Sequence, residues 1–238
     1  MLDYFYTLPQ NIKPDHVIIN GDEFNHLEHV MRKKVGDRIM VADGLCMAYE
    51  VEITKFDKRA VEGKIIAKHK NHNESELNVT IAIGMLKNPA KFDFLVEKVT
   101  ELGVREIIPL KSERTIPEHA KTERWQKLAL AAMKQCGRSL LPAVQPLTSL
   151  DKLLGTSDKF DLKLLFHNDI QQQHNINELL NYANLKSVLI LIGPEGGFSE
   201  SEVEKAVDHG FKTISLGARR LRTETAAIAA SALILARP

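Results

Sequence analysis

A glycine-rich segment near the carboxyl end has the residue types of a ligand-binding loop. It runs GPEGG from Gly193 to Gly197, after an apolar stretch and before a helix start signal in which Ser199 and Glu202 have capping-box spacing. Glycines let backbone N–H groups approach a ligand closely. No Lys-Ser/Thr pair follows, as a phosphate loop requires, and Glu195 would repel an anion. The pattern argues against a phosphate site, and a tight turn that needs glycine is the alternative to a ligand loop.

A second segment, LGARRLRTETA at 216–226, again combines a strand end, a glycine and a helix start. Thr223 or Thr225 is predicted to cap this helix, and Glu224 suits the positive end of its dipole. Three arginines within four residues are costly to pack together unless a surface anion or an acidic partner neutralises them. They are Arg219, Arg220 and Arg222.

Length and composition are those of an ordinary globular protein. The 238 residues are 44% hydrophobic and 26% charged, and the formal net charge is +1. The length allows one large domain or a medium domain with a small one. Without an overall basic charge, the protein must bind a polyanionic partner through a local patch.

The sequence also predicts a cytoplasmic location. The two cysteines form no paired motif, and no secretory signal is evident. The apolar run 226–236 is too short to span a bilayer.

The positions of strands and helices predict two domains. Strand candidates at 17–19, 38–42, 48–56 and 60–67 indicate a small antiparallel sheet or barrel over residues 1–70, with a short helix from Asp22 in which Phe24, Leu27, Val30 and Met31 have helical spacing. The polar stretch 71–78 is a predicted linker.

Strands and helices alternate over residues 79–238. Strands are expected at 79–85, 104–110, 162–166, 188–192 and 212–216, and helices at 90–103, 125–136, 176–184, 200–209 and 223–236. This alternation predicts an α/β domain with a parallel sheet covered on both faces. Both motif segments follow strands, and ligands of open α/β sheets bind at the carboxyl ends of strands.

Together these segments resemble a known family. GPEGGFS followed by LG-x-x-x-LRTETA resembles the SPOUT class of S-adenosylmethionine-dependent RNA methyltransferases, and more narrowly the bacterial enzymes that methylate N3 of a uridine in 16S ribosomal RNA. Further matches are HLEHVMR at 26–32 with GD at 36–37, EKVTELGV at 97–104, SER at 112–114 and QCGR at 135–138. The resemblance implies an amino-terminal PUA-like RNA-binding β-barrel and a carboxy-terminal α/β domain with a trefoil knot, which forms a homodimer.

The resemblance also implies that three loops hold S-adenosylmethionine. The matching residues of this chain follow three strand ends: Leu165, Phe166 and His167; Gly193, Pro194, Glu195, Gly196 and Gly197; and Ser215, Leu216, Gly217, Leu221, Arg222, Thr223, Thr225 and Ala226. The cofactor is a sulfonium cation, so a carboxylate such as Glu195 is tolerated where a phosphate would be repelled.

Catalysis requires that the uracil N3 lose its proton as it attacks the methyl group. Arg222 is a candidate to stabilise the developing anion, and Glu195 or Glu224 to take the proton. Between positions 86 and 138 there are 11 basic and 7 acidic residues, and a basic cluster lies near residue 33. Phosphate contacts are expected from the cluster of Arg32, Lys33 and Lys34, and the resemblance implies them for Arg114 and Arg138.

Several alternatives remain open. A knotted enzyme acting on a ribose 2′-hydroxyl or on transfer RNA would share the fold, and an RNA-binding module could retain an inactive cofactor pocket. A small-molecule methyltransferase would leave the small domain and the basic midsection unexplained. His26 and His29 have helical spacing but no third ligand nearby, so no metal is expected. Cys136 and Trp125 lie on an apolar helical stripe and are predicted to belong to the core.

Overall fold

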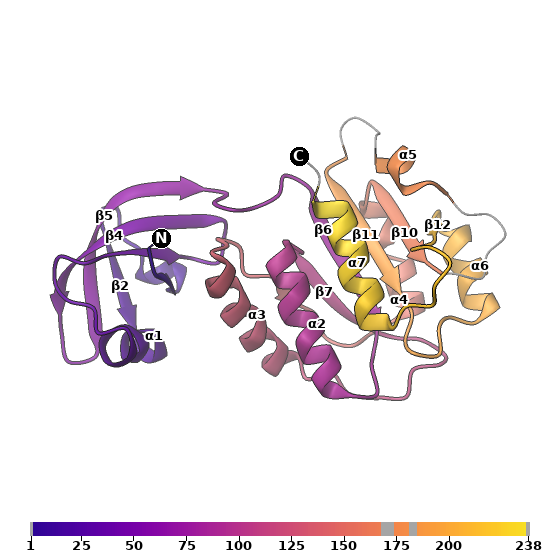
Figure 1. Cartoon of the computed structure of the whole chain (residues 1–238), viewed down its shortest axis with the longest axis horizontal. Coiled ribbons are helices and arrows are strands. Elements are labelled where there is room, and N and C mark those ends of the chain that lie inside the picture. Colours follow the sequence, from indigo (N-terminus) through magenta and orange to yellow (C-terminus); the bar gives the residue numbers. More distant parts are fainter. Residues whose placement is uncertain (1, 168–173, 181–184, 237–238) are drawn as a thin grey trace. The chain divides into compact units, whose positions relative to one another are not determined.

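The computed structural model of the chain describes residues 2–167, 174–180 and 185–236. It divides into two compact units, each with its own sheet (Figure 1). The first unit comprises Met1–Glu74 together with Leu130–Leu141, and the second comprises Ser75–Ala129 and Pro142–Pro238. The boundary after Glu74 falls inside the stretch predicted as a linker. Among the described residues, no helix has the length and apolar character to cross a membrane.

The first unit is built on a five-stranded sheet in the order β1-β3-β4-β5-β2. Strand β1 pairs in parallel with β3, and the other pairings are antiparallel, so the predicted small antiparallel sheet is present with one parallel edge strand. The strands are β1 Tyr4–Tyr6, β2 His16–Asn20, β3 Arg38–Ala42, β4 Met47–Phe56 and β5 Ala60–Lys70, with a short 3-10 turn at Pro9–Asn11.

The predicted helix after β2 is present but changes its geometry. Helix α1, Gly21–Asn25, continues into a wider turn at His26–Val30, where the Met31 N–H donates to the His26 carbonyl five residues back. In this wider turn the 3.6-residue spacing no longer applies. Phe24 and Leu27 are buried as predicted, whereas Val30 and Met31 are 66% and 37% exposed and do not belong to the core.

The second unit contains the predicted parallel sheet, in the order β12-β10-β11-β6-β7-β8, with β9 also pairing with β7. All of these pairings are parallel. The strands are β6 Asn78–Gly84, β7 Glu106–Lys111, β8 Ala143–Val144, β9 Thr148–Ser149, β10 Leu162–Phe166, β11 Ser187–Ile192 and β12 Lys212–Ile214. The last strand therefore ends two residues earlier than predicted.

Helices cover both faces of this sheet, as predicted. The helices are α2 Pro89–Leu102, α3 Thr122–Cys136, α4 Leu150–Leu154, α5 Ile176–Leu180, α6 Glu200–Asp208 and α7 Thr223–Leu235, with a 3-10 turn at Ser157–Lys159. On one face, α4 and α6 pack against side chains such as Leu165 and Leu191. On the other, α7 packs on β6 and β11 and against α2 (Figure 1). Residues 181–184 of the helix predicted at 176–184 lie outside the described residues.

Candidate active site

Three strand ends meet at one edge of the parallel sheet. The register places Phe166 of β10 beside both Ile192 of β11 and Ile214 of β12. The residues that follow these strands therefore start from the same edge, as the sequence predicted for the three loops. The His167 N–H donates to the Ile214 carbonyl at 3.1 Å, which joins two of these strand ends directly.

The GPEGG loop is held by two neighbouring segments. After β6, the Lys87 N–H donates to Oε1 of Glu195 at 3.0 Å. After β7, the exposed Arg114 donates from Nη1 to the Gly196 carbonyl at 2.8 Å. The loop is closed by a hydrogen bond of 2.9 Å from the Gly197 N–H to the Pro194 carbonyl. Its shape is therefore fixed by contacts from both sides.

The helix that follows this loop begins as predicted. The Ser199 side chain accepts from the Glu202 N–H, and the Glu202 carboxylate accepts from the Ser199 N–H, so the capping box is confirmed. Glu202 also accepts the Glu113 N–H at 2.7 Å, which ties the start of α6 to the segment after β7. A box of this kind satisfies N–H groups that have no partner within the helix.

The third loop has an open turn and a different helix cap from the one predicted. Gly217 adopts a φ of 101°, and its N–H donates to the Ser215 hydroxyl at 3.1 Å. Helix α7 begins at Thr223, and the capping position is occupied by Arg222, whose side chain makes no capping hydrogen bond. The prediction that Thr223 or Thr225 caps this helix is therefore wrong, because both lie inside its first turn.

The Glu224 carboxylate is nearly buried at the start of α7. Its Oε1 lies 3.0 Å from Nζ of Lys91, and its side chain is 11% exposed. Burial alone raises the pKa of a carboxyl group, but here backbone N–H donation, Lys91 and the nearby charge of Arg222 outweigh it, so the pKa of Glu224 lies below its ordinary value. Its Oε2 is buried and has no hydrogen-bond partner among the described residues.

The remaining residues of the three predicted loops differ in their burial. Leu165 and Phe166 are buried in the sheet, and Gly193 and Pro194, which directly follow β11, are buried as well. Leu216, Leu221 and Ala226 are half-buried. The exposed side chains between residues 215 and 226 belong to Ala218, Arg219, Arg220, Arg222 and Thr225.

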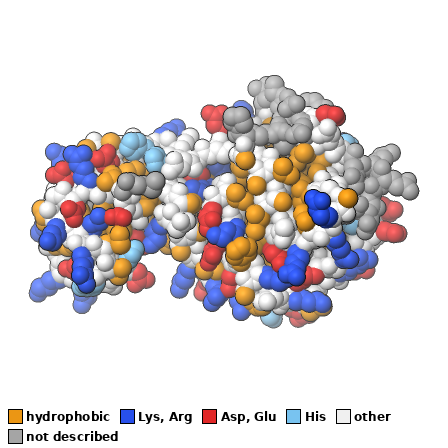
Figure 2. Space-filling view, viewed as in Figure 1, with side chains coloured by type: hydrophobic (Ala, Val, Ile, Leu, Met, Phe, Trp, Pro, Cys, Tyr) orange, Lys and Arg blue, Asp and Glu red, His pale blue; other side chains and the backbone are white. Residues whose placement is uncertain are grey.

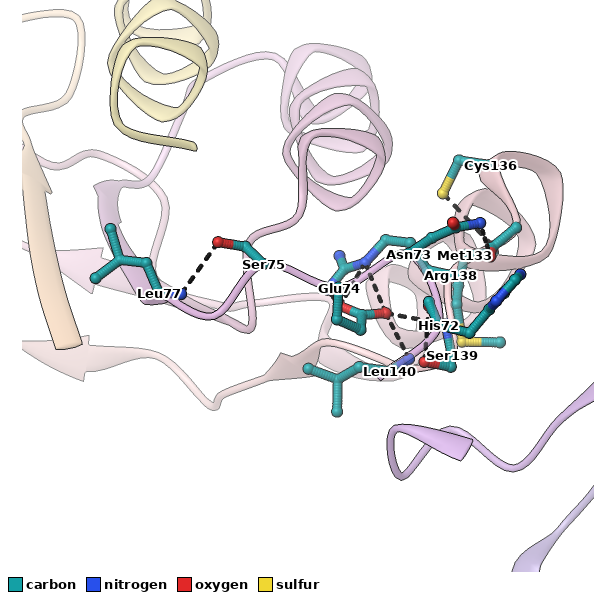
Figure 3. Close-up of polar contacts among 11 residues, drawn as sticks. His72, Asn73, Glu74, Ser75, Leu77, Met133, Cys136, Arg138, Ser139 and Leu140 are labelled. Atoms are coloured by element: carbon teal, nitrogen blue, oxygen red, sulfur yellow. Dashed lines mark hydrogen bonds and ion pairs between the residues drawn. The ribbon is translucent and has the colours of Figure 1, made fainter. Parts of the chain in front are cut away.

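Arg138 does not present its charge to solvent. Its side chain is 3% exposed and donates from Nε and Nη2 to the carboxylate of Glu74, which is 1% exposed. The same carboxylate accepts the N–H groups of Ser139 and Leu140 (Figure 3). The prediction that Arg138 binds RNA phosphates is therefore wrong for this structure. Its guanidinium is committed to a buried ion pair that ties the end of α3 to residue 74.

The other side chains that were predicted to contact phosphates differ in their exposure to solvent. Arg114 is exposed beside the GPEGG loop. In the first unit, Arg32 and Lys34 are exposed, and Arg32 adopts a φ of 51°. Lys33 is half-buried and forms an ion pair with Asp3.

The structure also shows the surroundings of four residues that were weighed as alternative functional residues: His26, His29, Trp125 and Cys136. Within the described part of the chain, no group of three or more side chains suits a metal ion, including those around His26 and His29. Trp125 is buried as predicted and donates from Nε1 to Asp93. Cys136 is half-buried, with its Sγ 3.5 Å from the Met133 carbonyl.

Sequence reasoning missed the segment that follows β6. Lys87 and Lys91 contact the two motif segments, yet neither lies in a recognisable motif. A lysine in the first turn of a helix, where the dipole is positive, is the one local signal that could have identified Lys91.

Comparison with known proteins assigns the chain to a family. A family model described as an RNA methyltransferase domain matches residues 73–235, and one described as an RNA methyltransferase PUA domain matches residues 19–66. The ribosomal RNA small subunit methyltransferase E of Bacillus subtilis is 31% identical over 226 residues, which cover 91% of this chain and 88% of that protein.

Solved structures agree over nearly the whole chain. The ribosomal RNA small subunit methyltransferase E of Neisseria gonorrhoeae, bound to S-adenosyl methionine, has a TM-score of 0.87 and 32% identity, and the match covers 98% of this chain and 97% of that one. A methyltransferase of Legionella pneumophila in complex with the same cofactor has a TM-score of 0.84 and 28% identity, covering 99% and 98%. This chain, with a PUA-like first unit and a parallel α/β second unit, therefore belongs to the RNA methyltransferase family that includes ribosomal RNA small subunit methyltransferase E.

Proposed function

We propose that this chain transfers a methyl group from S-adenosylmethionine to N3 of a specific uridine in 16S, the small-subunit, ribosomal RNA. The observation that carries the proposal is the alignment of three loops at one edge of the parallel sheet. Two similar solved structures hold S-adenosylmethionine, and the similar proteins are named for small-subunit ribosomal RNA. The N3 position follows from the resemblance of the GPEGG and LRTETA segments.

The residues at this edge fit the proposed cofactor. Gly217 is exposed, has a positive φ, and has no atom within 4 Å of the position that a Cβ would take, so its backbone is open to a ligand. Glu195 and Glu224 place negative charge in the region, which suits a sulfonium cation. The loops at 165–167, 193–197 and 215–226 would hold the cofactor, which supplies an electrophilic methyl group when bound.

Arg222 and one of the two carboxylates Glu195 and Glu224 are proposed to act on the uracil during methyl transfer. Arg222 lies exposed at the start of α7, where its charge would stabilise the uracil anion that forms as N3 loses its proton. The ion pair with Lys91 stabilises the charged form of the Glu224 carboxylate and makes it a weaker base. We therefore propose that Glu195, rather than Glu224, accepts the proton of the uracil N3. Arg222→Ala is expected to lower turnover by about 100-fold or more, the usual effect of removing one such donor. Full turnover at saturating cofactor would contradict this role.

RNA is proposed to contact both units. Arg32 and Lys34 are exposed in the first unit, and Arg114 is exposed beside the GPEGG loop in the second. Phosphate contacts of this kind give affinity and register without sequence choice. Replacing one of them by Ala is expected to weaken binding similarly for all RNA sequences and to reduce the slope of log K against log salt by about 1.

A second copy of the chain is proposed as a partner. Hydrophobic side chains gather over α7 and the adjacent α2 in the second unit (Figure 2). Phe94 and Leu233 are large apolar residues of these helices and are 48% and 49% exposed. Light scattering is expected to give the mass of a dimer, and Leu233→Glu to shift it to the monomer. We also propose the trefoil knot of the family and a cytoplasmic location.

The direct test is methyl transfer to defined RNAs. The chain is incubated with radiolabelled S-adenosylmethionine and, separately, with small ribosomal subunits, naked small-subunit RNA and transfer RNA from cells that lack this protein. Label in the subunit or its RNA, recovered as 3-methyluridine, is the expected result. Label in a 2′-O-methylated nucleoside or in transfer RNA would overturn the acceptor. Failure to bind the cofactor at all would favour an RNA-binding module with an inactive pocket.

A further inference from the structure

The segment 84–91, which runs from the last residue of β6 into the first turn of α2, lies against the GPEGG loop. Gly84 ends β6, and a Cβ at this position would lie 2.2 Å from the Pro194 backbone nitrogen and 2.8 Å from the Gly193 carbonyl carbon. Only glycine permits so close an approach of two backbones. Three residues later, the Lys87 N–H donates to the Glu195 carboxylate. The segment therefore contacts three consecutive residues of the loop.

The same segment sets the position of α2 and of Lys91. The Asn88 side chain caps the helix by accepting the Ala90 N–H at 3.0 Å, and Pro89 occupies the first helical position. Lys91 therefore lies in the first turn, where the helix dipole disfavours a cation. A charge held at the unfavourable end of a helix needs a partner from elsewhere in the fold.

That partner belongs to the third motif segment. Nζ of Lys91 lies 3.0 Å from Oε1 of Glu224 in the first turn of α7, with side-chain exposures of 34% and 11%. Glu224 directly follows the loop that contains Arg222, so Lys91 reaches the end of the third loop while Lys87 holds the second. The short segment 84–91 thus touches both loops at the sheet edge.

We propose that Lys91 is a positioning residue for methyl transfer: through Glu224 it fixes the start of α7, and with it the third loop, relative to the segment that also holds the GPEGG loop. The inference rests on the proposed function, because it concerns the loops assigned to the cofactor. Lys91 acts through Glu224 and need not touch the cofactor. Without Lys91, the distance between the GPEGG loop and the third loop can change, while the sheet that carries both loops keeps its structure.

The test compares three variants on one helix. Lys91→Met is expected to raise the dissociation constant for S-adenosylmethionine, measured by calorimetry on the folded chain, by about tenfold, within the usual range for coupled sites. Lys91→Arg keeps the ion pair and is expected to restore most of the affinity. Lys98→Met is the matched control, because Lys98 lies on α2 but pairs with Glu101, and it is expected to bind as the wild type does.

A double variant separates positioning from a general loss of stability. If Lys91 acts through Glu224, K91M causes no further loss of affinity in an E224Q background, where the ion pair is already absent. A purely structural role would lower the melting temperature and leave the dissociation constant of the folded chain unchanged, which would overturn the proposal. Equal losses from K91M in both backgrounds would overturn it as well. A wild-type chain that fails to bind the cofactor would refute the proposed function, and this inference with it.

Discussion

Replacing Gly84 by Ala tests how tightly the end of β6 holds the GPEGG loop. The new Cβ would lie 2.2 Å from the Pro194 nitrogen, 2.4 Å from Cδ of its ring and 2.8 Å from the Gly193 carbonyl carbon. Ordinary contact begins near 3.4 Å, so the Pro194 backbone must move by about 1.2 Å. None of these atoms is the free end of a flexible side chain, so the loop itself has to shift.

Two effects of this shift are expected. Overpacking of this kind costs about 1–3 kcal/mol of folding free energy. At about 2–4 °C per kcal/mol for a chain of this size, the melting temperature falls by about 2–12 °C. A displacement of about 1 Å at a reacting site lowers turnover by about 100-fold. We therefore expect a variant that stays folded at 25 °C and transfers methyl groups about 100 times more slowly.

Gly155→Ala provides the matched control. Gly155 has a φ of −63° at the end of α4, and the nearest atom to a Cβ there is the Asp151 carbonyl oxygen at 3.5 Å. This substitution is expected to leave turnover unchanged and to stabilise the chain by up to about 1 kcal/mol. Wild-type melting temperature and turnover in the Gly84→Ala variant would refute the argument that this glycine positions the loop.

Two further predictions concern stability. Arg138→Met leaves the Glu74 carboxylate buried without its guanidinium partner and is expected to cost about 3–5 kcal/mol in denaturant unfolding; an unchanged free energy of unfolding would contradict the buried pair. The pKa of Asp161 is lowered because its carboxylate accepts the Lys186 N–H and the Ser187 hydroxyl and N–H. The contribution of Asp161 to stability is therefore complete above the ordinary pKa near 3.8 and is lost as the pH falls through the lowered pKa. Melting temperatures measured from pH 5 to about pH 2 are therefore expected to fall less steeply for Asp161→Asn than for the wild type; parallel curves would contradict this.

Features that depend on neighbouring residues were predictable from the sequence. The capping box of Ser199 and Glu202 and the left-handed Gly103 at the end of α2 follow from side chains a few residues apart. The buried strands at β6 and β11 follow from short apolar runs. Because strands and helices alternate there, a parallel sheet follows as well.

Features that depend on distant partners were not predictable. The burial of Arg138 needs Glu74, 64 residues away in the chain, and so an arginine predicted to face RNA lies in the interior. The pairing of Lys91 with Glu224 likewise joins two helices that only the fold brings together. Residues 130–141 belong to the first unit, although residues 130–136 are the second half of α3, which begins in the second unit. The exposure of Val30 required knowledge of the wide turn at residues 26–30.

The chemical identity of the methylated nucleoside tests the central claim most directly. Small-subunit RNA labelled by the chain with S-adenosylmethionine is digested to nucleosides and analysed by mass spectrometry against standards. The proposed function predicts a single labelled species, 3-methyluridine, which forms with the wild-type chain and is reduced about 100-fold with Arg222→Ala. A labelled 2′-O-methylated nucleoside, or a methyl group on another base, would contradict it.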